Sequence, residues 1–206
     1  MIDYRDAWAR QKECVARVIQ GGPEALLVGE HPAVITLGRA SRAEHILAPR
    51  PELERRGIPV IEVDRGGDVT LHAPGQLVIY PVLNLKHYRR DLKFYLHQLE
   101  QSVIDFLNSF GIVACRFPSR TGVWINDKKI ASIGIGVRKW VSFHGISVNI
   151  TPDLRLFSLV KSCGLDAALT SVEAETGEKT GMKEAKNIFI ETFIRHFSGL
   201  KGLSYA

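Results

Sequence analysis

The run TGVWINDKKIASIGIGVRKWVSFHGISVNI, residues 121–150, decides the fold of this chain. Its many β-branched and aromatic residues favour extended strands over 121–126, 129–138 and 141–150. Asn126, Asp127 and Lys128 form a polar break where the chain can reverse, although the glycine of the strongest hairpin turns is absent. Strands joined by so few residues pair antiparallel. The run therefore predicts an antiparallel sheet.

Outward from this run, hydrophobic periodicity predicts the remaining elements. Helical spacing of apolar residues indicates helices over 4–19, 91–110 and 182–198, with a short helix over 51–56. Short apolar segments predict further strands over 25–29, 33–37, 59–63, 76–85 and 112–115. We found no repeat or linker, so residues 1–206 are expected to form one α+β domain, a mixed and mostly antiparallel sheet with packed helices.

Composition narrows the class of protein. The chain has 206 residues, 45% hydrophobic and 24% charged, which is typical of a globular domain. No apolar run is long enough for a membrane span, and the first residues do not resemble a signal peptide, so we expect a cytoplasmic protein with no membrane partner. The formal charge of +5 favours acidic partners. The chain has no long run of basic residues interleaved with aromatic residues, so its sequence does not predict nucleic-acid binding.

The segment RGGDVTLHAPGQ, residues 65–76, is the first candidate for chemistry. Two adjacent glycines let a ligand approach the backbone closely, and Thr70 and His72 point to one face of an extended stretch. The segment matches neither a phosphate-binding P-loop nor a dinucleotide-binding glycine motif. A glycine-rich hairpin with an ordinary histidine is the alternative.

Three further segments stand out. Lys129 enters a strand of apolar and small residues, where loss of water favours a neutral amine, whereas a solvated turn is the alternative. Gly145 interrupts the strand FHGISVN, which indicates a bulge or a close contact, while His144 suits an ordinary edge residue. Cys163 lies beside a glycine in a predicted loop, whereas Cys14 and Cys115 fit a packed interior better. Three sparse cysteines predict neither disulfides nor a metal site.

Together and in this order, these segments resemble the lipoyl(octanoyl) transferases of lipoate biosynthesis. The resemblance runs from about Tyr4 to Leu165 and includes Glu30-His31-Pro32 with Thr36-Leu37-Gly38-Arg39, and Ala43-Glu44-His45-Ile46-Leu47. It implies the fold of the biotin and lipoate protein ligases. The chain departs from the family motif at Leu71 and Ala73, where tyrosine and glycine are usual, so we expect a reshaped pocket. A Lys-Ser pair also precedes Cys163, and the strand usual before the Tyr4 helix is expected to be missing.

The resemblance assigns roles to residues. It implies a catalytic pair of Cys163 and Lys129. It also implies that three segments bind the acyl substrate: Arg65, Gly66, Gly67, Asp68, Val69, Thr70, Leu71 and His72; Ser132, Ile133 and Gly134; and Gly145, Ile146 and Ser147.

The implied activity is an acyltransferase reaction with no bound cofactor and no metal. An octanoyl group passes from octanoyl-acyl carrier protein, whose phosphopantetheine arm holds it as a thioester, to Cys163 and then to a lysine of a lipoyl domain. The implied acceptors are the lipoyl domains of 2-oxoacid dehydrogenases and the glycine cleavage H protein. Two alternatives remain open: an ATP-dependent lipoate or biotin ligase of the same fold, and a non-catalytic protein that binds acyl chains or acyl carrier protein.

Overall fold

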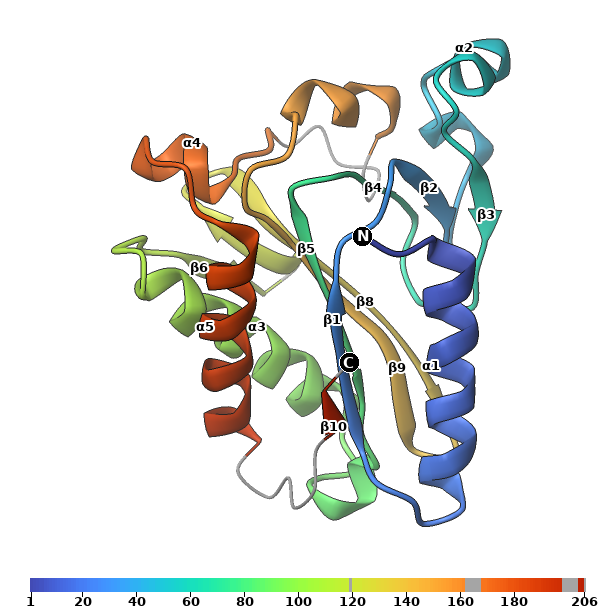
Figure 1. The fold of residues 1–206 in the computed structure, drawn as a ribbon, viewed down its shortest axis with the longest axis vertical. Helices are drawn as coiled ribbons and strands as arrows, with labels where there is room; N and C mark the ends of the chain where they lie inside the picture. Colours follow the sequence, from blue (N-terminus) through green and yellow to red (C-terminus); the bar gives the residue numbers. More distant parts are fainter. Residues whose placement is uncertain (119, 162–167, 198–203, 206) are drawn as a thin grey trace.

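The computed structural model describes residues 1–118, 120–161, 168–197 and 204–205 (Figure 1). Its helices are α1 (Tyr4–Ile19), α2 (Arg50–Arg55), α3 (Leu92–Asn108), α4 (Val172–Thr176) and α5 (Met182–His196), with short 3-10 turns at Ala43–His45, Leu85–His87 and Leu154–Leu159. Its strands are β1 (Ala25–Gly29), β2 (Val34–Leu37), β3 (Val60–Glu62), β4 (Val69–His72), β5 (Gln76–Val82), β6 (Cys115–Phe117), β7 (Arg120–Ile125), β8 (Lys128–Arg138), β9 (Val141–Asn149) and β10 (Ser204–Tyr205).

The run 121–150 forms the middle of the larger sheet, as predicted. The described strands of this sheet lie in the order β10-β1-β5-β9-β8-β7-β6, with only the β1–β10 pair parallel. Asn126, at the β7–β8 turn, has a φ of 53°, and Lys139 and Trp140, at the β8–β9 turn, have φ values of 51° and 68°. Positive φ matches the right-handed twist of antiparallel strands, so both hairpins close tightly without glycine.

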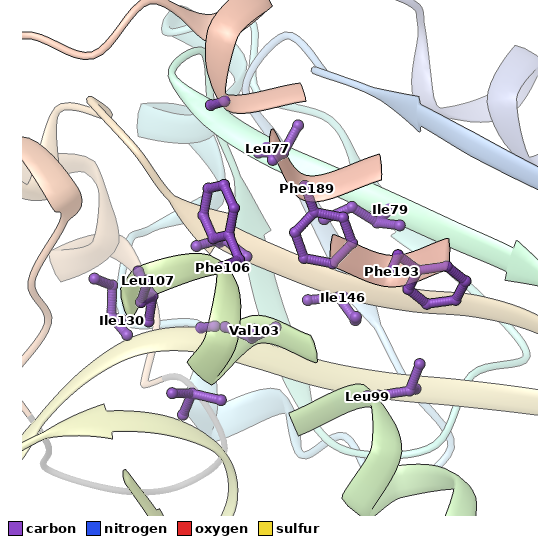
Figure 2. Close-up of a cluster of buried hydrophobic side chains, with 14 of the residues drawn as sticks. Leu77, Ile79, Leu99, Val103, Phe106, Leu107, Ile130, Ile146, Phe189 and Phe193 are labelled. Atoms are coloured by element: carbon purple, nitrogen blue, oxygen red, sulfur yellow. The ribbon is translucent and has the colours of Figure 1, made fainter. Parts of the chain in front are cut away.

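Helices α3 and α5 cover one face of this sheet and α1 covers the other. Figure 2 shows Phe106 of α3 with Phe189 and Phe193 of α5 in one cluster with Leu77 and Ile146 of the sheet. All five side chains are no more than 2% exposed, and each contributes roughly 1.5–3 kcal/mol through burial. The period of 2 along β5 places alternate residues on opposite faces, which creates this two-sided core.

Beneath α1, a second apolar cluster fills the other face. Val15 and Val18 of α1 pack there with Val78 and Tyr80 of β5, whereas Leu77 of the same strand belongs to the α3–α5 face. The sheet therefore lies between two helical layers, and the predicted α+β fold is confirmed.

A smaller sheet of the order β3-β2-β4 carries the glycine-rich segment beside this body (Figure 1). Strand β4 pairs antiparallel with β2, with Leu71 opposite Ile35 and Thr70 opposite Thr36. Val69 and Leu71 are buried in a cluster of their own with Ile35. Because alternate residues face opposite ways, Thr70 and His72 are turned away from that cluster.

A few local predictions were wrong. The strand expected over 112–115 begins only at Cys115, and Cys115 is exposed rather than packed. Leu92, one of the apolar residues that predict the helix over 91–110, is 42% exposed because it occupies the first helical position, while Tyr95 and Leu99 face the core. In the part of the chain that the structure describes, no helix has the length and apolar character required to cross a bilayer.

Candidate active site

A cleft opens where the smaller sheet meets strands β8 and β9 of the larger one. Its empty space, part of which is open solvent, has a volume of about 420 Å³. It is lined by Tyr4 of α1, Arg65 before β4, Thr70 and His72 of β4, Tyr80 of β5, Ser132, Ile133 and Gly134 of β8, and His144, Gly145, Ile146 and Ser147 of β9.

Two paired glycines allow this close approach of the elements. Gly134 and Gly145 lie opposite each other in the β8–β9 register. A Cβ at Gly145 would lie 2.3 Å from the Ile79 carbonyl oxygen, and one at Gly134 would lie 3.0 Å from that of Gly66. The Gly66 N–H donates to the Ile135 carbonyl at 2.8 Å, which ties the glycine-rich loop to β8. A larger side chain at Gly134 would push the loop away from β8, and one at Gly145 would collide with the neighbouring strand β5.

Arg65 brings a permanent positive charge into the cleft and is only 6% exposed. Its Nη2 donates to the carbonyl oxygen and to Oγ1 of Thr36, both at 2.9 Å, and its Nη1 donates to the Gly66 carbonyl at 3.0 Å. These contacts fix the plane of the guanidinium, which can therefore attract a carbonyl or carboxylate oxygen.

Three buried histidines lie at the cleft: His72 and His144 line it, and the His31 ring packs behind that of His72, with ring centroids 5.8 Å apart. His31 donates to the Ile2 carbonyl at 2.8 Å, His72 contacts Gln76 at 2.7 Å, and His144 contacts the Asp64 carboxylate at 2.9 Å. Burial lowers the pKa of all three rings, that of His72 to about 3, because the charged imidazolium is poorly solvated there. They are therefore neutral near pH 7.

His144 has an unusual backbone, with a φ of 54°. In a regular strand the His144 side chain would lie on the same face of the sheet as that of Ser142. This is the face covered by α3, because the Ser142 hydroxyl lies 3.1 Å from the Tyr95 hydroxyl of that helix. Instead the His144 side chain faces α1, where Tyr4 Oη lies 3.4 Å from its Nδ1 and Gln11 Oε1 accepts from its backbone N–H at 2.8 Å. The left-handed φ thus places His144 in the cleft.

Lys129 lies in a recess next to this cleft. The recess has an empty volume of about 250 Å³ and shares Thr70 and Ser132 with the cleft. Lys129 is 3% exposed, and its Nζ lies 5.4 Å from the centroid of the Trp124 ring. The alternative of a solvated turn is therefore wrong for Lys129, whereas Lys128 is half exposed and pairs with Glu175 at 3.2 Å.

Cys163 lies outside the described residues, but the segments on both sides of residues 162–167 are attached to the site. The Lys161 N–H donates to the His45 carbonyl at 2.8 Å, and the His45 ring pairs with the Asp68 carboxylate of the glycine-rich loop. On the other side, the Lys129 N–H donates to the Ala168 carbonyl at 2.8 Å.

Of the fourteen residues assigned to acyl binding, nine line the cleft: Arg65, Thr70, His72, Ser132, Ile133, Gly134, Gly145, Ile146 and Ser147. The other five support it or face elsewhere. Gly66 and Gly67 form the loop, Asp68 accepts the Val69 N–H at 2.8 Å, and Val69 and Leu71 are buried below.

The two departures from the family motif also fall outside the cleft lining. Ala73 and Leu71 are fully buried in the apolar cluster of Ile35, and Leu71 borders the Lys129 recess. Leu71 in place of the usual tyrosine would therefore change the shape of the Lys129 recess rather than that of the cleft.

The sequence reading missed Tyr4, Tyr80 and His144 as residues of the cleft. Tyr4 and Tyr80 are spaced as ordinary core residues of a helix and a strand, so periodicity does not distinguish them. For His144 the adjacent glycine was the available signal, because a residue before Gly145 can leave the strand alternation.

Comparison with known proteins shows the family and the fold of the chain. Residues 3–194 match the family model described as the lipoyl protein ligase A/B catalytic domain. An octanoyltransferase of Solibacter usitatus is 43% identical over 198 residues, which are 96% of this chain and 88% of that protein. An octanoyltransferase of Thermosynechococcus vestitus is 40% identical over 208 residues, 100% of this chain and 89% of that protein.

Solved structures share the fold at lower identity. A putative lipoate protein ligase of T. acidophilum with bound lipoic acid superposes with a TM-score of 0.74 at 16% identity, covering 96% of this chain and 83% of that one. A lipoate-protein ligase A bound with ATP gives 0.75 at 17% identity, with coverage of 95% and 80%.

Proposed function

Because the chain belongs to the lipoyl protein ligase A/B catalytic-domain family, and within it to the octanoyltransferases, we propose that it moves an octanoyl group from octanoyl-acyl carrier protein to a lysine of a lipoyl domain. The transfer runs through a thioester on Cys163. Lipoyl domains of 2-oxoacid dehydrogenases and the glycine cleavage H protein are the proposed acceptors.

One observation supports this reaction above the others: the buried amine of Lys129 lies beside the cleft while its backbone is paired to the segment that follows Cys163. The Lys129 backbone makes two such bonds: its N–H donates to the Ala168 carbonyl, and its carbonyl accepts from the Thr170 N–H at 3.0 Å. The preceding segment is attached through Lys161 and His45 to the loop of Arg65. The described residues on both sides of 162–167 are thus attached to elements that form the cleft and the Lys129 recess.

The first step exchanges one thioester for another. The Cys163 thiolate attacks the octanoyl carbonyl, a new C–S bond forms, and the bond to the carrier's sulfur breaks. The carrier thiolate leaves and takes a proton from the Lys129 ammonium, which becomes the neutral amine that the second step requires. Lys129 as an ammonium stabilises the Cys163 thiolate before the attack. Because one thioester replaces another, no further source of free energy is needed.

The second step makes the amide. The neutral amine of the acceptor lysine attacks the octanoyl carbonyl on Cys163, a C–N bond forms, and the C–S bond breaks. Lys129 as a neutral amine takes the proton that the nitrogen loses, and the Cys163 thiolate leaves. Arg65 and the rigid backbone of the cleft stabilise the oxyanion that forms during the attack.

The acyl chain is proposed to lie along the cleft side of β8 and β9, where the residues are small: Ser132, Gly134, Gly145 and Ser147. The Ile133 and Ile146 side chains belong to the core beneath α3 and α5, so they support this floor from behind. Each CH₂ of the acyl chain that is removed from water in the cleft contributes about 0.8 kcal/mol.

Intact-mass analysis tests the proposal directly. After incubation with octanoyl-acyl carrier protein, without ATP, the chain should gain one octanoyl group and pass it to an added lipoyl domain. Cys163→Ala should abolish the gain. Cys115→Ala is the matched control because Cys115 is an exposed thiol, and Cys14→Ala tests a buried one. Acylation that survives Cys163→Ala would contradict the assignment.

The same assay separates this reaction from ATP-dependent ligation. A ligase would join free octanoate or lipoate to the lipoyl domain only with ATP, and would not need a thioester donor. A strict requirement for ATP would therefore exclude the proposed reaction.

A further inference from the structure

Two of the three cleft histidines have both ring nitrogens paired within the protein. Nδ1 of His31 must carry the proton, because its partner is the Ile2 carbonyl, and its Nε2 then accepts from the Tyr80 hydroxyl at 2.7 Å. In His144 the two ring nitrogens have the opposite roles. Its Nε2–H donates to the Asp64 carboxylate, and its Nδ1 faces the Tyr4 hydroxyl.

The tautomer of His72 follows from a longer chain of hydrogen bonds. The chain starts at the Thr170 carbonyl, which can only accept, so the Asn149 atom at 2.9 Å is Nδ2. Asn149 Oδ1 then faces Gln76 at 2.9 Å, which must present Nε2. Gln76 Oε1 is left to face His72 Nδ1 at 2.7 Å. Nδ1 of His72 therefore carries a proton, and Nε2 of the neutral ring has a lone pair.

Unlike the other two rings, His72 has no hydrogen-bond partner for that lone pair among the described residues. Only Gln11 and Arg116 have a side-chain N or O atom that is sealed from solvent without a partner in the part of the chain described. His72 Nε2 is therefore not sealed, and its side chain lines the cleft. Among these three histidine rings of the described residues, His72 is therefore the one with a ring nitrogen left open toward the cleft.

We propose that Nε2 of His72 accepts a hydrogen bond from an N–H group of the substrate, and that Gln76 and Asn149 are positioning residues that hold the ring in this tautomer. The inference rests on the proposed function. An octanoyl thioester itself carries no N–H. The donor is then either the amine of the acceptor lysine or an amide of the carrier's phosphopantetheine arm, and the two belong to different half-reactions.

The surroundings of His72 keep the ring in its acceptor state. The groups that face it come from every neighbouring element: Tyr4 of α1, His31 after β1, Arg65 before β4, Gln76 of β5 and His144 of β9. None of them is an anion, and Arg65 disfavours a second positive charge. Nε2 is therefore an orienting acceptor over the physiological pH range rather than a base.

The variant Gln76→Glu should make the rate of one half-reaction depend on pH. A carboxylate at Nδ1 favours the imidazolium, and a protonated His72 presents Nε2–H, which can no longer accept. The rate of the half-reaction that supplies the N–H should fall about tenfold for each pH unit below the raised pKa and recover above it. Gln101→Glu makes the same chemical change on α3, where Gln101 bonds to Arg116, and should leave the pH profile unchanged.

Two measurements complete the test. Nitrogen-15 NMR of histidine-labelled wild-type protein near pH 7 should show His72, assigned by its loss in His72→Gln, protonated at Nδ1; a proton on Nε2 would overturn the proposal. Rapid-quench assays of Gln76→Glu should then show the acid-side loss in one half-reaction. A loss in acylation by octanoyl-acyl carrier protein identifies the arm amide, and a loss in transfer to the lipoyl domain identifies the amine.

Equal pH profiles for Gln76→Glu and wild type in both half-reactions would overturn the inference. A wild-type protein that transfers no octanoyl group would instead refute the proposed function, while the NMR result would still report the tautomer. The two failures are thus distinguishable.

Discussion

Gly122 of β7 leaves the space that the Lys129 side chain occupies. A Cβ at Gly122 would lie 2.7 Å from Cε and 3.3 Å from Nζ of Lys129, and 2.5 Å from the Ala131 carbonyl oxygen. The Gly122 N–H donates to the buried Glu100 carboxylate at 3.1 Å, which fixes this part of β7 to α3. The position of the amine therefore depends on a glycine in the neighbouring strand.

Gly122→Ala should displace Lys129 and lower the rate of octanoyl transfer at least tenfold. Gly177→Ala is the matched control, because Gly177 also has a positive φ, 75°, but a Cβ there would meet nothing within 4 Å. Both variants carry backbone strain of about 1–2 kcal/mol, which denaturant unfolding will measure. Equal transfer rates in the two variants would show that the contact with Lys129 is unimportant.

Lys129→Met should separate packing from chemistry. Methionine retains a flexible apolar chain in the narrow recess, so the free energy of unfolding should change by less than about 1.5 kcal/mol. Both half-reactions should slow strongly, because the variant has neither an ammonium for the thiolate nor an amine for the proton.

Lys129→Arg should retain some acylation and lose transfer, since guanidinium keeps the charge but does not give up a proton in proteins. Rapid-quench assays that resolve acyl-enzyme formation from transfer will distinguish the two. Near wild-type transfer in both variants would exclude Lys129 from the chemistry.

Acid should destabilise the protein through its buried histidines. The pKa of His72 is about 3 in the folded chain and about 6.5 in the unfolded chain, so only the unfolded state binds this proton between those values. Stability is fully present above pH 6.5 and falls as the pH decreases, by about 2 kcal/mol between pH 7 and pH 5 for this group.

Urea unfolding of His72→Gln at both pH values will show this linkage, because glutamine does not titrate. The loss of stability between pH 7 and pH 5 should be about 2 kcal/mol smaller than in wild type. His87→Gln is the control, since the His87 side chain is 65% exposed. An unchanged loss in His72→Gln would mean that His72 is charged in the folded state.

Salt should weaken the binding of the proposed acidic partners to this chain of net charge +5. We expect the KM for octanoyl-acyl carrier protein to rise with ionic strength while kcat changes little, because exposed charges are screened over roughly 8–10 Å at physiological salt. Steady-state rates between low and high salt will measure this. A KM that does not depend on salt would refute the role of net charge.

The sequence by itself determined the elements whose causes are local. Asp91 caps α3 by accepting the Phe94 N–H at 3.0 Å, as its position before an apolar stripe predicts. The apolar run within 76–85 predicts the strand β5, and the polar break at Asn126 predicts the β7–β8 turn. Such signals are sufficient because caps, turns and periodicity depend on residues that are neighbours in the chain.

The sequence also marked much of the candidate site, but only as segments. The glycines of 65–76 and Gly145 indicated close backbone contact, and the family resemblance added Gly134, without showing that all three meet at one cleft. That meeting depends on the pairing of β8 with β9 and on the approach of the smaller sheet, which are contacts between residues far apart in the chain.

Only the tertiary structure decided what the polar side chains in the site do. The turn next to Lys129 was compatible with exposure, and burial follows from Gly122, Trp124 and the pairing with Ala168. Tyr4 and His144, separated by 140 positions, meet because α1 packs on the sheet and the left-handed φ of His144 turns the ring toward it. Burial and tautomer are set by the assembled surroundings of a group, which no local pattern contains.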